Sequence, residues 1–302
     1  MAKCAGATEL EAMALGGLGD AEYVRGRMIS AYDRFRQCVE LCERHGFGRI
    51  EVANRPMMAF TQWFAGDTRG AVGVADIAIA RAARVGHRRA EMIGHHAAFF
   101  CRHALMDFEA ASRHAQSALT LAQQLGARRF ETEALAFLAE LHRLAGRRAE
   151  AIANAEEAVR ISRETSPAFL GPFALGVLAL ATDDPTARQA ALQEAEALLD
   201  AGAVSHNHLL FPRDAIEAYF EARDWKRMER CAAELEQYTG SEPLPFADFY
   251  IARGRALAAF GRGQSDAREL TAELERIRTQ GEQVGIRVAL PVIETAINQL
   301  RG

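Results

Sequence analysis

The sequence predicts an all-α protein built from repeated helical hairpins, and three observations lead to that prediction. Alanine accounts for 60 of the 302 residues, against 8 prolines, and alanine has the highest intrinsic helix propensity. Short motifs recur at a fixed step of 40 residues. Apolar residues within each unit are spaced three and four residues apart, as on one face of an α-helix. This composition excludes a β-sandwich or a β-barrel.

The repeat is clearest in three segments that align without gaps: HGFGRIEVAN, VGHRRAEMIG and LGARRFETEA. Each contains a glycine, an arginine and a glutamate in the same places, and the glycines are Gly46, Gly86 and Gly126. Two further series keep the same step. They are Ala31, Ala71, Ala111, Ala151 and Ala191, and Gly26, Gly66 and Gly146 with Met106 in the vacant place. A step of this length is typical of a helical repeat protein.

Each 40-residue unit is interpreted as two helices. In the second helix, small residues such as Ala111, Ala115 and Ala118 follow an i, i+4, i+7 spacing, which forms one stripe and lets a neighbouring helix approach closely. We expect second helices to begin at acidic N-cap residues and to end at glycines that take a left-handed conformation. The expected caps are Asp67, Asp107 and Asp184, and the expected end points are Gly46, Gly86 and Gly126.

We expect residues 1–302 to form a single solenoid. Its parts are regular 40-residue repeats over 1–165, irregular repeats over 166–240, and a final hairpin with a capping helix over 246–302. The final hairpin is predicted at Phe249–Phe260 and Ser265–Gln280, after the proline-containing loop GSEPLPFAD. The last apolar stretch, Val288–Leu300, is predicted to cap the stack. The total is about seven hairpins and one cap.

Composition also argues against several classes of function. The net charge is −4 and the only lysines are Lys3 and Lys226, so no nucleic-acid partner is expected. Neither lysine follows a glycine, which excludes a phosphate-binding P-loop. The five cysteines have no paired spacing, which is typical of free thiols in a protein of a reducing compartment. The sequence contains no signal peptide and no apolar run of membrane-spanning length. We therefore expect a cytoplasmic protein with no membrane association and no cofactor.

The small-residue stripe of the second helices, together with Leu138-Ala139-x2-His142 and Gly146 in and after a first helix, resembles the tetratricopeptide repeat. That family has a period of about 34 residues rather than 40. The resemblance implies a right-handed superhelical solenoid of tetratricopeptide-like helical hairpins. Armadillo or HEAT repeats are the structural alternative, and prolines inside first helices (Pro56, Pro172 and Pro212) favour them.

Most of the chain also resembles the C-terminal helical-repeat tails of bacterial multidomain proteins that carry a class III adenylate/guanylate cyclase domain and an AAA-type ATPase. The similar segments include CVELCERHGFGRIEVAN, LGARRFETEALAFLAEL, FLGPFALGVLALATDDP and EPLPFADFYIARGRALAAFGRG. The catalytic motifs of those domains have no counterpart here. The resemblance implies a regulatory sensor or scaffold module. ELEAMALGGLGDAEYVRG reads as a repeat helix with no capping helix before it, so we expect either a fragment or a chain whose open N-terminal end pairs, for instance in a homo-oligomer.

Projecting the register onto the first helices, which line the concave face in tetratricopeptide arrays, gives a candidate binding groove. One row contains Tyr23, Trp63, His103 and Arg143, and the next contains Asp20, Phe60, Phe100 and Glu140, with His96 near by. A concave aromatic surface with a few polar groups suits a protein, a peptide or a small effector. The alternative is that Phe60 and Phe100 pack between hairpins as core residues. A secondary candidate is His206 with His208, although Ser205 or Asn207 in the same segment is expected to cap a helix.

Several other patterns are assigned structural roles. His95, His96, Cys101 and His103 share one predicted helix, but their spacing is not that of a zinc-binding helix, and no metal is expected. Cys38 is expected to be a small buried residue of the stripe rather than half of a redox pair with Cys42. The Arg/Glu pairs at 49/51, 89/91 and 129/131 are expected to bridge adjacent repeats at the surface.

The sequence therefore predicts a non-enzymatic module that binds a protein, peptide or small effector and passes that state to a signalling ATPase or cyclase. An oligomerisation module is one alternative. The other is an enzyme built from the aromatic and histidine groove, which would require titratable groups that converge in a closed pocket.

Overall fold

The computed structural model describes residues 2–263 and 266–302, with side chains from residue 6 onward, and in this part of the chain every regular element is a helix. The hairpins are α1 (Ala2–Val24) with α2 (Met28–His45), α3 (Gly48–Phe64) with α4 (Thr68–Arg84), α5 (Arg88–Ala104) with α6 (Phe108–Gln124), α7 (Arg128–Leu144) with α8 (Arg148–Thr165), α9 (Pro167–Ala181) with α10 (Pro185–Asp200), α11 (Asn207–Glu221) with α12 (Trp225–Thr239), and α13 (Pro245–Arg262) with α14 (Ala267–Val284). A 3₁₀ turn, η1 (Arg287–Ala289), and α15 (Leu290–Arg301) follow. The all-α solenoid with seven hairpins and a terminal helix is confirmed.

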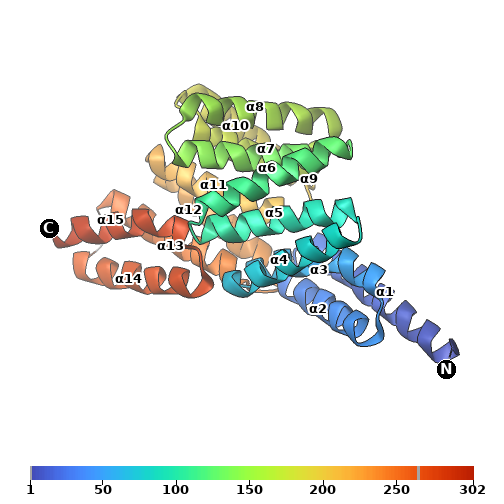
Figure 1. Cartoon of the computed structure of the whole chain (residues 1–302). Helices are drawn as coiled ribbons and strands as arrows, with labels where there is room; N and C mark the ends of the chain where they lie inside the picture. The colour runs from blue at the N-terminus through green and yellow to red at the C-terminus, as the bar shows by residue number, and fades with distance from the viewer. Residues whose placement is uncertain (1, 264–265) are drawn as a thin grey trace.

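Consecutive helices pack against each other along the whole chain. In Figure 1 the hairpins lie side by side from α1 to α8. The helices α9 to α12 connect this part of the stack to the last hairpin. The N- and C-termini lie at opposite ends of the molecule. None of the described helices combines the length and the apolar character that crossing a lipid bilayer requires.

The predicted turn and cap residues take the conformations that the repeat demands. Gly26, Gly66 and Gly146 all have a positive φ, and Met106, which replaces glycine in that series, has φ of 67°. A non-glycine residue in this region is strained, so the turn geometry of the repeat outweighs the cost at Met106. The carboxylate of Asp67 accepts a hydrogen bond from the amide of Gly70 at 2.9 Å, as expected of an N-cap. Asp107 and Asp184 cap α6 and α10 in the same way.

The alanines of the second helices form the tightly packed interior of the stack. Ala71, Ala111 and Ala151 have no exposed surface, and Ala191 is 3% exposed. In α1, a side chain at Gly19 would meet the ring of Phe35, so that glycine permits close approach between the first two helices.

The C-terminal third departs from the prediction in its boundaries. α13 begins at Pro245, four residues before the predicted start, because proline is well accommodated in the first turn of a helix. α14 begins at Ala267 with Asp266 as its N-cap, and the predicted start at Ser265 lies outside the described residues. The predicted capping helix is split into η1 and α15.

The superhelix also closes on itself, which the sequence did not predict. Phe246 of α13 packs edge-on against Trp63 of α3, with ring centres 5.0 Å apart. The hydroxyl of Thr68, at the start of α4, donates a hydrogen bond to the carbonyl of Val284 at 2.6 Å. The last hairpin is therefore held against the second hairpin, and much of the concave face lies inside the protein.

Candidate ligand-binding site

The predicted site residues separate into a core cluster and three cavities. Trp63 and Phe100 are 2% and 1% exposed, and their rings stack with centres 4.7 Å apart. Both belong to the main hydrophobic core. The alternative for Phe60 and Phe100, packing between hairpins as core residues, describes Phe100. Phe60 is 8% exposed and belongs to the same core, but it also lines a cavity.

Tyr23, Phe60, His96 and His206 meet around one cavity of about 290 Å³, which we call the aromatic cavity. First helices of successive hairpins form its walls, from α1, α3, α5, α7 and α9, and the segment before α11 completes it. Its lining is Asp20, Tyr23, Ala53, Met57, Phe60, Arg89, Ile93, His96, Arg129, Phe130, Glu133, Phe169, Leu170 and His206. Apolar and aromatic side chains with a few converging polar groups are typical of a ligand pocket.

Two arginines lie over aromatic rings of this cavity. The guanidinium carbon of Arg129 is 4.5 Å from the ring centre of Phe169 and 5.0 Å from that of Phe130, and the guanidinium carbon of Arg89 is 5.5 Å from Phe130. Burial, and then the nearby charge of Arg89, lowers the pKa of Arg129. Within the described part of the chain neither arginine forms an ion pair. The aromatic cavity therefore presents two cations that form no ion pair with the described residues, and two carboxylates, those of Asp20 and Glu133, also line it.

This arrangement corrects the expectation for the repeated Arg/Glu pairs. Glu91 and Glu131 pair with Arg88 and Arg128 of their own helices and not with a neighbouring repeat. Arg89 and Arg129 are the members that reach the next repeat, by stacking on rings rather than through ion pairs.

His96 contributes a buried polar atom to the aromatic cavity. Its ring is 3% exposed, and Nδ1 is hydrogen-bonded to a carboxylate oxygen of Glu133. An ionised carboxylate can only accept, so Nδ1 carries the proton. Nε2 is buried and has no hydrogen-bond partner among the described residues.

His206 and Tyr23 form a second polar pair in the wall. Nε2 of His206 donates to the carbonyl of Phe169 at 2.5 Å, so Nδ1 accepts from the hydroxyl of Tyr23 at 2.7 Å. Burial lowers the pKa of His206, which keeps the ring neutral in this role. The pair joins α1 to α9 through the segment before α11.

The neighbouring residues do not cap α11 as the sequence suggested. The hydroxyl of Ser205 donates to the carbonyl of Tyr23 at 2.5 Å, and Nδ2 of Asn207 donates to the carbonyl of Phe169 at 2.9 Å. The capping prediction was therefore wrong. These side chains satisfy backbone groups of other hairpins, a role that short-range sequence patterns do not reveal.

His103 and Arg143 line a different cavity, of about 230 Å³, between α7, α11 and α13. Its walls carry many charged groups, and we call it the charged cavity. Burial, and then the charges of Arg213 and Arg143, lowers the pKa of His103 to about 3, so this ring is neutral. The other histidines of α5 point to separate partners, because Nδ1 of His95 lies 2.9 Å from Nδ1 of His114.

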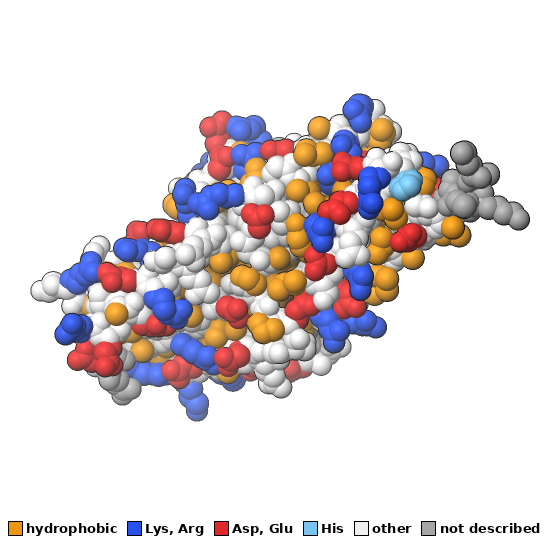
Figure 2. Space-filling view, turned by 90° about the horizontal axis from the view of Figure 1, so that it is seen from below, with side chains coloured by type: hydrophobic (Ala, Val, Ile, Leu, Met, Phe, Trp, Pro, Cys, Tyr) orange, Lys and Arg blue, Asp and Glu red, His pale blue; other side chains and the backbone are white. Residues whose placement is uncertain are grey.

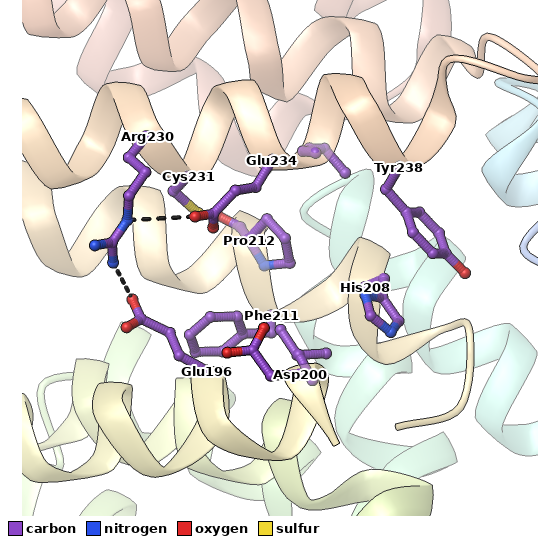
Figure 3. A pocket seen from close by; sticks show the side chains of 11 residues that line it. Glu196, Asp200, His208, Phe211, Pro212, Arg230, Cys231, Glu234 and Tyr238 are labelled. Atoms are coloured by element: carbon purple, nitrogen blue, oxygen red, sulfur yellow. Dashed lines mark hydrogen bonds and ion pairs between the residues drawn. The ribbon is translucent and has the colours of Figure 1, made fainter. Parts of the chain in front are cut away.

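His208 lines a third pocket, of about 270 Å³, between α10, α11 and α12. Figure 3 shows its ring beside Tyr238, and the two rings stack with centres 4.4 Å apart. Arg230 forms ion pairs with Glu196 at 2.8 Å and with Glu234 at 3.3 Å. Because its cation is already paired with carboxylates, this pocket offers less to a ligand than the aromatic cavity does.

Among residues 6–263 and 266–302, no group of three His, Cys, Asp or Glu side chains is arranged to hold a metal ion. Cys38 is buried, and burial raises its pKa to about 12. The reactive thiolate is thus disfavoured at this position.

Sequence reasoning missed Arg89, Arg129, Phe130 and Phe169 as site residues. The arginines were visible as members of the 40-residue repeat. To assign them to a binding site, one would have to know where Phe169 lies. Phe169 follows closely after the proline that starts α9, in a region where the sequence no longer follows the register of the repeat.

No protein-family model and no curated protein matches this sequence. Among solved structures, the chain is similar to a tetratricopeptide repeat protein from Parabacteroides merdae ATCC 43184. The two share 11% sequence identity with a TM-score of 0.49, over 96% of this chain and 99% of that one. The hairpins of this protein themselves assign it to the helical-repeat class. The aromatic cavity is its candidate site.

Proposed function

We propose that this protein is a non-catalytic binding module that recognises an anionic ligand with an aromatic or apolar part in the aromatic cavity. The observation that carries the proposal is the pair of guanidinium groups, on Arg89 and Arg129, that lie on the rings of the cavity without carboxylate partners. A carboxylate or phosphate is the natural partner of such groups. The ligand is a small effector or the acidic end of a peptide.

The chemistry of the lining favours binding over catalysis. Its residues include no serine, threonine, cysteine or lysine that could act as a nucleophile. The hydroxyl of Tyr23 is engaged with His206, and burial, followed by the charge of Glu133, raises its pKa. These groups are arranged to hold a ligand.

A ligand in this cavity would touch five successive hairpins at once. It would favour the superhelical curvature that closes the lining around it, since binding shifts a conformational equilibrium by its differential affinity. This supports a sensor role. The finer proposal, a regulatory tail of or partner to a signalling ATPase or nucleotide cyclase, rests on the sequence resemblance, and an open reading frame continuous with such a domain would establish it.

The binding proposal is tested with N-acetyl-L-phenylalanine and with an acetylated tetrapeptide that ends in phenylalanine. Isothermal titration of the full chain should detect binding of at least one of them. Losing a charge-assisted hydrogen bond costs about 1.5–3 kcal/mol, so Arg129→Gln and Arg89→Gln should each weaken binding by about tenfold or more.

Arg49→Gln is the matched control, because Arg49 holds the same place one repeat before Arg89 and is not in the lining of the aromatic cavity. It should bind like the unmodified chain. Absence of binding by both compounds, or equal binding by Arg129→Gln and Arg49→Gln, would contradict the proposal.

A second candidate, self-association through α1, is favoured by the exposed apolar side chains of that helix. Leu10, Met13 and Val24 are 66%, 57% and 61% exposed and fall on one helical face at 100° per residue. Over the face in Figure 2, acidic and basic side chains are intermixed with hydrophobic ones. Light scattering should show a dimer that Leu10→Glu with Met13→Glu converts to a monomer, and a strictly monomeric unmodified chain would exclude this candidate.

A further inference from the structure

The charged cavity is separate from the aromatic cavity and lies beneath the C-terminal cap. Side chains from α5, α7, α11 and α13 form its polar wall, and α9, η1 and α15 contribute apolar groups. Its volume of about 230 Å³ is below the usual range for drug-sized ligands, which is about 300–1,000 Å³. Only a small molecule would fit.

Two arginines organise the polar wall. Nε of Arg213 donates to Asp214 at 2.7 Å, and its Nη2 donates to a carboxylate oxygen of Glu140. Nη2 of Arg253 donates to Glu217 at 2.6 Å, and its Nε donates to the carbonyl of Ala289 at 3.1 Å. Arg213 and Arg253 are 8% and 1% exposed, so these ion pairs hold the side chains in place.

The same wall contains polar atoms that the protein leaves unpaired. Of the buried side-chain atoms without a hydrogen-bond partner in the described part of the chain, five belong to residues that line this cavity. They are Nε2 of His103, Oε2 of Glu140, Nε of Arg143, Oδ2 of Asp214 and Nη1 of Arg253. Burying such a group unpaired costs about 1–3 kcal/mol. Their concentration around one small cavity indicates a bound partner that satisfies them.

The unpaired atoms are of two kinds. The carboxylate oxygens of Glu140 and Asp214 can accept hydrogen bonds, which suits an ammonium group, whereas the guanidinium nitrogens of Arg143 and Arg253 can only donate, which suits a carboxylate. Three arginines and three acidic residues line the cavity, so a ligand without net charge matches it best. An anion alone would leave the two carboxylate oxygens unpaired, and a cation alone would leave the two guanidinium nitrogens unpaired.

The rest of the lining is largely apolar. Its side chains are those of Leu144, Leu180, Val288, Pro291 and Val292. A short aliphatic group on the ligand would gain about 25 cal/mol for each Å² of apolar surface that it buries there.

We propose that the charged cavity binds a free amino acid with an aliphatic side chain. Its ammonium group is held by Glu140 and Asp214, its carboxylate by Arg143 and Arg253, and its side chain by the wall around Val292. This site is independent of the aromatic cavity and does not rest on the function proposed for it.

The probe for this site is L-leucine, compared with 4-methylpentanoate and isoamylamine, which keep the carbon chain around the missing group and carry only one of the two charged groups. Titration calorimetry of the full chain should detect leucine binding. The affinity of each single-charge analogue should be lower by a factor of about ten or more. Leucine should also raise the melting temperature, because a ligand that binds the native state stabilises it.

Two variants test the location without removing a buried ion pair. Val292→Phe fills the apolar end and Arg143→Gln removes one carboxylate-binding group; each should weaken leucine binding by about tenfold. Arg147→Gln, an exposed change one turn along the chain, is the control. Arg129→Gln, which alters the aromatic cavity, should leave leucine binding unchanged.

Failure of leucine to bind, or equal binding by Val292→Phe and Arg147→Gln, would overturn the proposal. Binding of 4-methylpentanoate or isoamylamine as tightly as leucine would equally overturn it, because the site would then not recognise a zwitterion. None of these results bears on the ligand of the aromatic cavity, which is tested with different probes.

Discussion

The carboxylate of Glu242 accepts a hydrogen bond from the hydroxyl of Ser30, a residue 212 positions earlier in the chain. It also accepts from the backbone amide of Ile29 at 2.8 Å. These groups form the first turn of α2, whose own N-cap residue, Arg27, supplies no side-chain hydrogen bond. A carboxylate at this end of a helix is favoured by the helix dipole. The loop after α12 therefore supplies the missing cap of α2 and helps to close the superhelix.

Replacing this cap should destabilise the fold. Glu242→Ala is expected to lower the free energy of unfolding by about 1–2 kcal/mol, the range for loss of an N-cap, as measured by urea denaturation. Glu236→Ala is the control, since Glu236 forms an exposed ion pair with Arg255, and exposed ion pairs contribute little to stability. An equal decrease in the free energy of unfolding of the two variants would mean that the contact of Glu242 with α2 stabilises the fold no more than an exposed ion pair does.

The alanine stripe predicts a strong dependence on side-chain size. Ala111→Leu should lower the free energy of unfolding by about 1–3 kcal/mol because the added atoms have no space between the packed hairpins. Ser112→Leu places the same side chain at the next, exposed position of α6 and should change stability by about 0.5 kcal/mol or less. Comparable thermal melts for both variants would show that the stripe is not tightly packed.

Buried histidines make the fold sensitive to acid. Burial, and then the charges of His114 and His96, lowers the pKa of His95 to about 4, and the pKa values of His103 and His206 are also lowered. Below pH 6.5 the unfolded chain takes up protons that the native chain does not, so stability falls as the pH drops toward 4.

Asp214 acts in the opposite direction. With no ammonium group bound beside it, burial raises its pKa to about 7, so between pH 7 and 4 the native state of the ligand-free protein holds a proton that the unfolded state has released, which favours folding as the pH falls. Burial also raises the pKa values of Asp20, Glu234 and Asp248. Five histidines have lowered pKa values, and histidine is the side chain whose ordinary pKa lies between pH 5 and 7.5, so the histidines dominate in this range. The urea midpoint should therefore be lower at pH 5 than at pH 7.5. This decrease should be smaller in His95→Gln than in the control His45→Gln, which changes an exposed residue. A midpoint that does not move with pH would contradict this account.

The regular part of the fold could be predicted because its signals are local and repeated. Helix ends depend on capping residues such as Asp67 and on turn residues such as Gly66 within a few positions, and the alanine grid fixes how hairpins stack. The contact between Trp63 and Phe246 spans 183 residues across a region where the register is lost, so no local pattern could indicate it. That closure is why part of the predicted groove is core, and why only part of it lines cavities.

The closure itself can be measured by a double-mutant cycle on Trp63 and Phe246, whose rings meet edge-on between α3 and α13. Each single change to alanine should cost about 3–5 kcal/mol, as for other buried aromatic residues. Their combination should cost less than the sum by about 0.5–1.5 kcal/mol, the usual coupling of an aromatic pair. Leu192→Ala is the control partner, because it is buried in α10, which does not pack against α3, and its effect should add to that of Trp63→Ala. Additive losses for Trp63 and Phe246 as well would show that the last hairpin does not hold the second in solution.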